Sequence, residues 1–321
     1  MILVTGGAGC VGANVARRFA DLGYDVVAHD ISWRTIDFFE KDPKIRKIEG
    51  NILHQGHITG IVKDFGIEGI VHTAAVRAES VARTKPAATV VTNVIGTLNL
   101  LEAARTNDVK RFIFTSTVAV YGPMPPSSRE LIEENRPLNP KGIYSASKVA
   151  AEVIGDRYYE MFDVDFVILR LAIVYGPYQT YENFISILLR RAILGQPIIM
   201  PSGGDQPWNC VYVKDVAKAC ALAYEARTLT HRAFNLISDR RTMFELVKII
   251  RKLKPDVKVE VGPGLADQKT FEKVGYTIGT PPGLTTYSIK RAQEELGYEP
   301  EYNLEKGMEE FFNWLKVHAT Q

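Results

Sequence analysis

The chain has 321 residues, of which 46% are hydrophobic and 24% are charged, so it can bury a large core in one large domain or two closely joined ones. Its formal net charge of +2 argues against a dedicated nucleic-acid-binding protein, which would carry a strongly basic face. No run reaches about 18 apolar residues, the length that spans a membrane.

The chain begins with Met1 followed directly by an apolar segment, without a basic leader, so we expect a cytoplasmic protein. Cys10, Cys210 and Cys220 are odd in number and lack the spacing of metal ligands. We therefore expect reduced thiols that act as small apolar residues, and no metal site.

Short apolar runs alternate with longer segments of helical periodicity through the first half of the chain. The runs that predict strands are Ile2–Gly6, Asp25–Asp30, Gly69–Ala75, Arg111–Thr117 and Asp165–Val174. Continuous apolar strands separated by helices indicate a parallel sheet that is covered on both faces. The predicted fold class is α/β, a Rossmann-type doubly wound sheet.

Beyond about residue 175 the pattern is less regular. Segments that contain proline and glycine alternate with helical stretches at Met243–Lys254 and Ile289–Gly297. We predict a nucleotide-binding domain over residues 1–174 and a smaller, mixed α/β substrate-binding lobe over residues 175–321, with residues 211–236 returning to the first domain.

The segment TGGAGCVG, Thr5 to Gly12, lies between the first strand and the first helix. Gly6, Gly9 and Gly12 allow a pyrophosphate to approach the backbone, beside Cys10 and Val11 at the start of the helix. Asp30 ends the second strand, where a carboxylate accepts hydrogen bonds from ribose hydroxyls and repels a 2′-phosphate. This combination predicts NAD as the cofactor, although Arg34 nearby is a group that could accept the phosphate of NADP.

The segment YSASK places Tyr144 and Lys148 four residues apart, on one face of a helix. A neighbouring ammonium and a positively charged nicotinamide favour the phenolate form of the tyrosine and lower its pKa. Ser116 and Thr117 end the fourth strand, at the sheet edge where ligands bind in open α/β folds. These residues predict an oxidoreductase site.

With these motifs in place, the chain resembles the extended short-chain dehydrogenase/reductase family, in particular its epimerase/dehydratase members. The motifs follow the family's order over nearly the whole chain: TGGAGCVG, Asp30, HTAA, NVIGT, STVAVYG, YSASK, LRLAIVYGP and EELGYEP. The resemblance implies Tyr144 as the general acid/base, Lys148 as the residue that tunes its pKa and binds the nicotinamide ribose, and Thr117 as a ligand of the reacting oxygen, with Ser116 nearby.

The resemblance also implies further contacts. The remaining cofactor-binding residues would be Asn51, which replaces the family's usual aspartate, together with Ile52, Ala74, Ala75 and Asn93. The helices that start near Asn93 and Tyr144 would form a four-helix homodimer interface; ordinary packing on the sheet is the alternative.

The residues after Thr117 limit the types of reaction that the site could catalyse. Family members that eliminate water carry an acidic pair there, whereas Val118 and Ala119 have no proton to exchange. Reversible oxidation of a secondary alcohol remains, which ends at the ketone in a dehydrogenase or is followed by reduction on the other face in a 4-epimerase. The motif does not choose between them.

Three positions bear on whether the substrate carries a nucleotide diphosphate. Ile173 stands where nucleotide-sugar enzymes usually carry Asn, Trp208 where they carry Arg, and Pro281–Leu284 where they carry an R-x-G-D element. Each lost charge-assisted hydrogen bond to a diphosphate is worth about 1.5–3 kcal/mol. Ile173 and Trp208 are therefore candidate substrate-pocket residues, with Trp208 as a core residue the alternative interpretation.

The preferred hypothesis is an NAD-dependent oxidoreductase acting on a sugar, sugar acid or polyol without a nucleotide-diphosphate clamp. The second is a nucleotide-sugar 4-epimerase whose clamp comes from other basic residues, the candidates being Arg77, Lys85, Arg190, Arg191 and Lys214. A non-catalytic NAD-sensing protein is a third hypothesis, against which the intact Thr117, Tyr144 and Lys148 argue.

Overall fold

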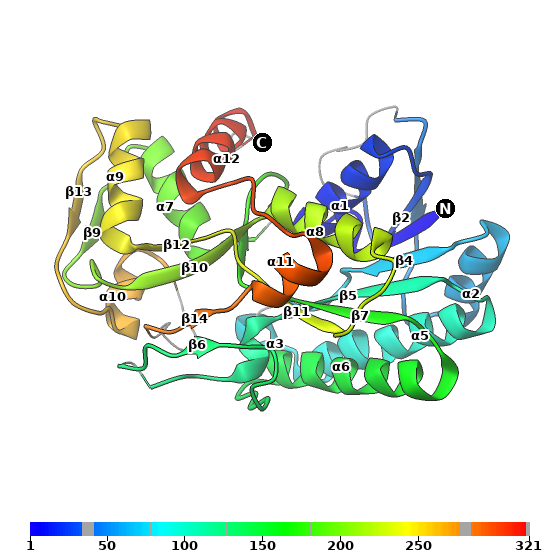
Figure 1. The fold of residues 1–321 in the computed structure, drawn as a ribbon. Coiled ribbons are helices and arrows are strands. Elements are labelled where there is room, and N and C mark those ends of the chain that lie inside the picture. Colours follow the sequence, from blue (N-terminus) through cyan, green and yellow to red (C-terminus); the bar gives the residue numbers. More distant parts are fainter. Residues whose placement is uncertain (34–41, 78, 126, 180, 277–283, 319–321) are drawn as a thin grey trace.

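The computed structural model describes residues 1–33, 42–77, 79–125, 127–179, 181–276 and 284–318 (Figure 1). A parallel seven-stranded sheet lies at its centre, in the order β11-β7-β5-β4-β1-β2-β3. The strands are β1 (Ile2–Thr5), β2 (Val26–Asp30), β3 (Ile45–Glu49), β4 (Gly69–His72), β5 (Arg111–Thr117), β7 (Phe166–Leu171) and β11 (Ala233–Leu236). The predicted fold class is confirmed.

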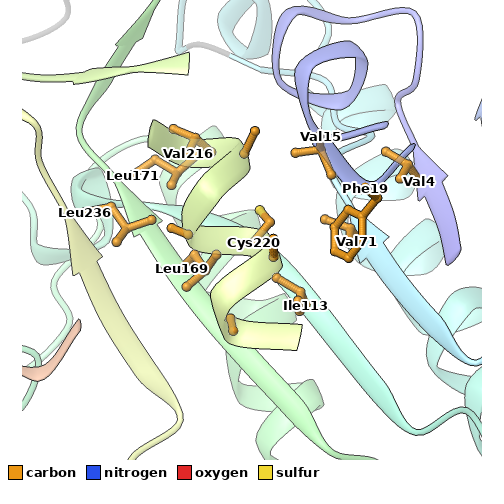
Figure 2. Packing of buried hydrophobic residues seen from close by; sticks show 14 of the residues in the cluster. Val4, Val15, Phe19, Val71, Ile113, Leu169, Leu171, Val216, Cys220 and Leu236 are labelled. Atoms are coloured by element: carbon orange, nitrogen blue, oxygen red, sulfur yellow. The ribbon is translucent and has the colours of Figure 1, made fainter. Parts of the chain in front are cut away.

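Helices cover both faces of this sheet, because alternate residues of each strand are apolar on both sides. On one face, helices α1 (Cys10–Asp21) and α8 (Val213–Glu225) pack over side chains such as Val4, Ile113 and Leu169, as Figure 2 shows. On the other face, Leu3, Phe112 and their neighbours pack against three helices: α2 (Gln55–Asp64), α5 (Gly96–Thr106) and α6 (Ile143–Phe162).

The strand β3 is absent from the predicted elements. Its sequence IRKIE reads as polar because β3 is an edge strand with mainly exposed or half-buried residues. The predicted strand Asp165–Val174 is in fact two strands. β7 ends at Leu171, and β8 (Ile173–Tyr175) pairs instead with β10 (Pro207–Tyr212) in a separate sheet.

The remaining elements build a second lobe with its own apolar core. In its three-stranded sheet, β10 lies between β8 and β12 (Asp239–Thr242). Small pairs join β9 (Ile198–Met200) to β13 (Val259–Val261) and β6 (Leu131–Ile132) to β14 (Thr286–Tyr287). The helices of this half are α7 (Phe184–Ile193), α9 (Met243–Leu253), α10 (Gln268–Lys273) and α12 (Leu304–His318). Helix α11 (Lys290–Leu296) packs instead on β11 and α8 of the large sheet.

Three elements late in the chain join the large sheet and its helices: α8, β11 and α11. Helix α8 packs against α1, and β11 pairs with β7 in the register Phe234 to Leu169. The chain thus leaves the large sheet after β7, adds strands to the second lobe, and returns to the sheet before entering the second lobe again (Figure 1).

One continuous helical segment, Pro86–Thr106, is long and apolar enough to cross a membrane by length and composition. It consists of α4 (Pro86–Val90), a π-helical turn (Val91–Ile95) and α5. Half of its most apolar window is buried within the protein, where it packs against α2 and α6.

The strand order places a topological switch point at β1, because β2 and β4 lie on its two sides. Connections diverge there to opposite faces of the sheet and open a crevice at the carboxyl ends of the strands. The glycine-rich loop, Asp30 and the end of β5 all lie at this edge.

Candidate active site

The glycine-rich loop turns directly from β1 into α1. Gly6 has φ of +73°, a conformation that favours glycine, and a Cβ on Gly12 would lie 2.1 Å from the Gly6 carbonyl oxygen. Gly9 is the N-cap of α1 and has no side chain to fill the helix terminus. The loop therefore fits a pyrophosphate held by backbone N–H groups at the positive end of a helix.

Asp30 closes this cradle from the end of β2. Its Oδ2 accepts a hydrogen bond from the Ala8 N–H at 3.0 Å, and its Oδ1 accepts one from the Ile31 N–H at 2.7 Å. Burial raises the pKa of this carboxyl, and the N–H donors act in the opposite direction. The position beside the loop suits the adenosine ribose; Arg34, the competing phosphate acceptor, lies outside the described residues.

The other predicted cofactor residues line the same edge. Asn51 and Ile52 follow β3, where the Asn51 Oδ1 accepts the Leu53 N–H at 3.0 Å. Cys10 is buried, and its thiol donates to the Pro177 carbonyl at 3.4 Å. Burial raises the pKa of this thiol to about 12. Val11, Ala74 and Ala75 are half-buried at this edge.

Asn93 lies in the π-helical turn and is 2% exposed. Its amide donates to the Val76 carbonyl and to the Ser147 hydroxyl, each at 2.9 Å, and accepts the Val76 N–H at 2.8 Å. Both amide protons are thus engaged within the protein. This geometry favours a role in fixing the loop after β4 against α6, next to the cofactor edge.

Thr117, Tyr144 and Lys148 come from the end of β5 and the first turns of α6. The half-buried Thr117 accepts the Ala119 N–H at 3.2 Å through Oγ1. Tyr144 is the second residue of α6 and Lys148 lies one turn later. The buried Lys148 ammonium donates to the Thr115 carbonyl at 2.8 Å and lies 4.5 Å from the Phe114 ring centroid.

The acid–base properties of this pair follow from burial. Burial raises the pKa of Tyr144 to about 12; the Arg77 guanidinium acts in the opposite direction and the Glu79 carboxylate adds to the rise. Burial lowers the pKa of Lys148 to about 8, against the Glu152 carboxylate, which raises it. The lowering of the tyrosine pKa expected from the sequence refers to the protein with nicotinamide bound.

Ser116 is buried, and its hydroxyl donates to the Glu152 carboxylate of α6. Glu152 in turn forms an ion pair with Arg170 of β7, whose Nη1 also donates to the Tyr121 hydroxyl at 2.9 Å. Ser116 is thus part of a buried polar network beneath the site. This contact favours a supporting role for Ser116, a predicted substrate-binding residue that the resemblance places near the reacting oxygen.

Arg77 is half-buried beside the catalytic residues, rather than a solvated surface charge. Its guanidinium carbon lies 3.4 Å from the centroid of the Tyr181 ring, and Cys10 and Tyr144 are both within its electrostatic reach. Of the other basic candidates, Lys214 forms an ion pair with Glu310.

The sequence analysis missed two residues of the site, Glu79 beside Tyr144 and Tyr181 beside Arg77. Neither is predictable from its own sequence neighbourhood.

Trp208 is 1% exposed, in the core of the second lobe. Its ring stacks on Phe184 with a centroid distance of 4.2 Å and an interplanar angle of 12°, and meets Phe271 edge-on at 5.6 Å. The alternative interpretation of Trp208, a core residue, therefore describes it better than a pocket wall. Ile173 is half-buried at the edge of the same cluster, and Pro281–Gly283 lie outside the described residues.

Within the described residues, no three His, Cys, Asp or Glu side chains gather in a way that could hold a metal ion. The three cysteines are buried free thiols. The chemistry available at the sheet edge is therefore that of hydroxyl, phenol and ammonium groups beside a dinucleotide cradle.

Comparison with known proteins places this geometry in context. Residues 2–236 match the profile of the NAD dependent epimerase/dehydratase family. A putative UDP-glucose 4-epimerase of Methanocaldococcus jannaschii is 30% identical over 98% of both chains. A dTDP-glucose 4,6-dehydratase of Xanthomonas campestris is 25% identical over 99% of this chain and 93% of the relative.

Solved structures agree with this assignment. The UDP-glucose 4-epimerase of Thermotoga maritima, solved with UDP-glucose, has a TM-score of 0.85 at 26% identity, with 99% of each chain covered. That of Thermus thermophilus, solved with NAD, has a TM-score of 0.80 at 25% identity over 98% of each chain. The predicted cofactor, NAD, and the predicted enzyme class are thereby confirmed. The chain belongs to the NAD-dependent epimerase/dehydratase family of extended short-chain dehydrogenases/reductases.

Proposed function

We propose that this enzyme catalyses reversible hydride transfer at a secondary alcohol of a carbohydrate-like substrate, a sugar, sugar acid or polyol, that is not held by a nucleotide-diphosphate clamp. The observation that carries the substrate half of this proposal is the position of Trp208. An aromatic core residue stands where the family resemblance implies a phosphate-binding arginine.

Three side chains would perform the chemistry. Bound NAD supplies the acceptor for the hydride that leaves the alcohol carbon. The Tyr144 phenolate takes the alcohol proton during oxidation, and the hydroxyl so formed returns it during reduction, while Thr117 hydrogen-bonds the same oxygen. Lys148 holds its positive charge one helical turn from Tyr144 and favours the phenolate.

The outcome of the reaction follows from what lies beside Thr117. Val118 and Ala119 open a short 3-10 helix (Val118–Tyr121) and bring no carboxylate to the site. An elimination step would need an acid and a base in addition to Tyr144. Oxidation to a ketone, with or without reduction on the opposite face, needs only the three residues above.

The packing around Trp208 supports the absence of a clamp. The side chains of Phe184, Phe271 and Trp208 are each at most 1% exposed. Tyr276 packs against Phe184 and Phe271. A diphosphate at this place would have to displace a stacked aromatic pair, and burying its charge without charge-assisted donors is costly.

A nucleotide-sugar 4-epimerase is the second candidate. It is favoured by the match along nearly the whole chain to a putative UDP-glucose 4-epimerase at 30% identity. If the enzyme is a 4-epimerase, Arg77 would supply the positive charge that binds the diphosphate. Its guanidinium is available for this role because it forms no ion pair with a carboxylate among the described residues.

Two measurements separate the candidates. The purified enzyme is incubated with NAD and a panel of sugars, sugar acids and polyols, and NADH absorbance is followed; the same protein is incubated with UDP-glucose, and UDP-galactose is sought by chromatography. Net NADH from the first panel, with no calorimetric binding of UDP, supports the proposal. UDP-galactose formed without net NADH overturns it in favour of the epimerase.

We further propose a homodimer in the cytoplasm. Apolar side chains are exposed along the α4 and π-helical segment and on α6, which pack side by side: Val90, Val91, Ile95, Ile143 and Val153. Their burial against a second copy would remove this surface from water. Light scattering should give a dimer mass that the substitution Val91→Glu reduces; a monomeric wild type would contradict the dimer.

A further inference from the structure

The helix that carries the catalytic tyrosine begins without an N-cap side chain, although the Ser145 hydroxyl in its first turn accepts the Gly142 N–H at 3.2 Å. Helix α6 starts at Ile143, and its N-cap is Gly142, which makes no side-chain cap. The first N–H groups of a helix have no partner within the helix, and an N-cap side chain normally accepts the second or third of them. Those two belong to Tyr144 and Ser145.

A carboxylate from a distant part of the chain takes this place. The Glu79 side chain accepts the Tyr144 N–H at 3.2 Å through Oε2 and the Ser145 N–H at 2.9 Å through Oε1. The Ser145 hydroxyl lies 2.9 Å from Oε1 as well. A Cβ added to Gly142 would lie 2.0–2.1 Å from the three atoms of the Glu79 carboxylate, so glycine leaves the room that the carboxylate fills.

The residues around Glu79 are themselves tied to the catalytic helix. Glu79 is the first residue of helix α3 (Glu79–Thr84), which packs against α6. Three residues earlier, the backbone of Val76 is held on both sides by the Asn93 amide, which also donates to Ser147 of α6. The carboxylate is therefore delivered from a segment that is anchored on α6 at two points.

We propose that Glu79 is a positioning residue for Tyr144, because its carboxylate caps the helix N-terminus in place of the side chain that Gly142 lacks. The proposal rests on the role of Tyr144 in the proposed function. The position of Tyr144 matters because displacing a reacting group by about 1 Å can lower the reaction rate severely.

The cap has an electrostatic consequence as well. The groups that face the phenol are Arg77, which lowers its pKa, Glu79, which raises it, and Tyr181. The carboxylate also neutralises the positive end of the α6 dipole, which would otherwise favour the phenolate. Removing the charge of Glu79 is thus expected to lower the pKa of Tyr144.

Three variants separate position from charge. E79Q keeps an oxygen acceptor without the charge, and E79A removes both. The double variant E79A/G142S replaces the distant cap by an ordinary serine N-cap, because removal of the carboxylate opens the space for a Cβ at residue 142. For each variant, kcat, KM and the pH profile of kcat are measured, together with NAD binding, thermal melting and amide hydrogen exchange in the first turn of α6.

In E79A we expect a fall in kcat on the order of tenfold and faster exchange of the Tyr144 and Ser145 amides, with NAD affinity nearly unchanged. E79Q should retain most of kcat, while the limb that reports Tyr144 ionisation moves to lower pH. E79A/G142S should recover kcat and amide protection but keep the shifted limb.

Wild-type values of kcat, pH profile and amide exchange in E79A would overturn the proposal. So would a failure of E79A/G142S to recover amide protection while the melting temperature is restored. If no substrate is turned over by the wild type, the proposed function fails, yet the amide exchange of the first turn still reports whether Glu79 caps the helix.

Discussion

Glu152 of α6 and Arg170 of β7 form an ion pair directly beneath the catalytic edge, with 2.7 Å between Oε2 and Nη2 and side chains only 2% and 7% exposed. The carboxylate also accepts the Ser116 hydroxyl, and the guanidinium donates to the Glu134 carbonyl at 3.0 Å. This pair joins the helix that carries Tyr144 to the strand that leads into the second lobe.

Breaking the pair by R170M should destabilise the protein by about 3–5 kcal/mol, because the Glu152 carboxylate is left buried and uncompensated. Denaturant unfolding measures the loss. R170M/E152M should be less destabilised than R170M alone, since no orphaned charge remains. The control is R157A, which breaks an exposed pair with Glu160 and should cost less than about 1 kcal/mol; a similar loss in both single variants would contradict this prediction.

The substitution Tyr144→Phe removes only the hydroxyl that moves the substrate proton. We expect kcat to fall by a factor on the order of 10²–10⁴, the usual contribution of a positioned acid–base group. NAD affinity, measured by calorimetry, should remain within about threefold of the wild type, a difference of less than 1 kcal/mol. Activity close to wild type would assign the proton transfer to another residue.

Asp30 should determine the choice of cofactor. D30A removes an acceptor from the ribose site and should weaken NAD binding about tenfold or more, since a charge-assisted hydrogen bond is worth about 1.5–3 kcal/mol. The variant should discriminate less strongly against NADP than the wild type does. Glu49, the register partner of Asp30 on β3, is exposed, and E49A serves as the matched control. Equal losses in the two variants would refute a specific role of Asp30.

Stability should fall as the solution is acidified through the range in which histidine titrates. His29 of β2 is 1% exposed, its ring nitrogens have no hydrogen-bond partner among the described residues, and burial together with His57 lowers its pKa to about 4. Between pH of about 6.5 and 4 the unfolded chain takes up a proton that the folded protein rejects. His29 thus contributes a loss of at most about 3 kcal/mol, complete only below pH of about 4.

The substitution His29→Leu should flatten the dependence of stability on pH, because leucine does not titrate. The leucine side chain suits this site, since the neighbours of residue 29 on that face of the sheet include the apolar Val27. His72 is also buried with a pKa well below its ordinary value, so the measurement is the difference between wild type and variant. Exposed His54 provides the control, H54Q. Parallel unfolding free energies for wild type and H29L at every pH would show that His29 does not titrate in this way.

Much of the fold could be predicted because the central strands are buried on both faces. β1, β4 and β7 contain only buried residues and therefore read as continuous apolar runs. The glycine loop was predictable for a steric reason, since Gly12 has no room for a Cβ. Tyr144 and Lys148 were predictable because their spacing is local to one helix.

Other features depend on contacts that no local pattern encodes. The cap on α6 joins residues 65 positions apart, and Glu79 has no neighbour in sequence that marks it. The division of the predicted fifth strand at Ala172 depends on which strand pairs next to it. Trp208 could be a core or a pocket residue by composition alone, and its stacking partner Phe184 decided the matter.

Ala172 is the only residue between β7 and β8, although these strands belong to different sheets. It is buried, and its N–H donates to the Leu236 carbonyl of β11 at 3.1 Å. The junction therefore contains no linker whose length or composition could drift. New specificities in this architecture have to arise through exchanged side chains and through the loops of the second lobe, where insertions are tolerated.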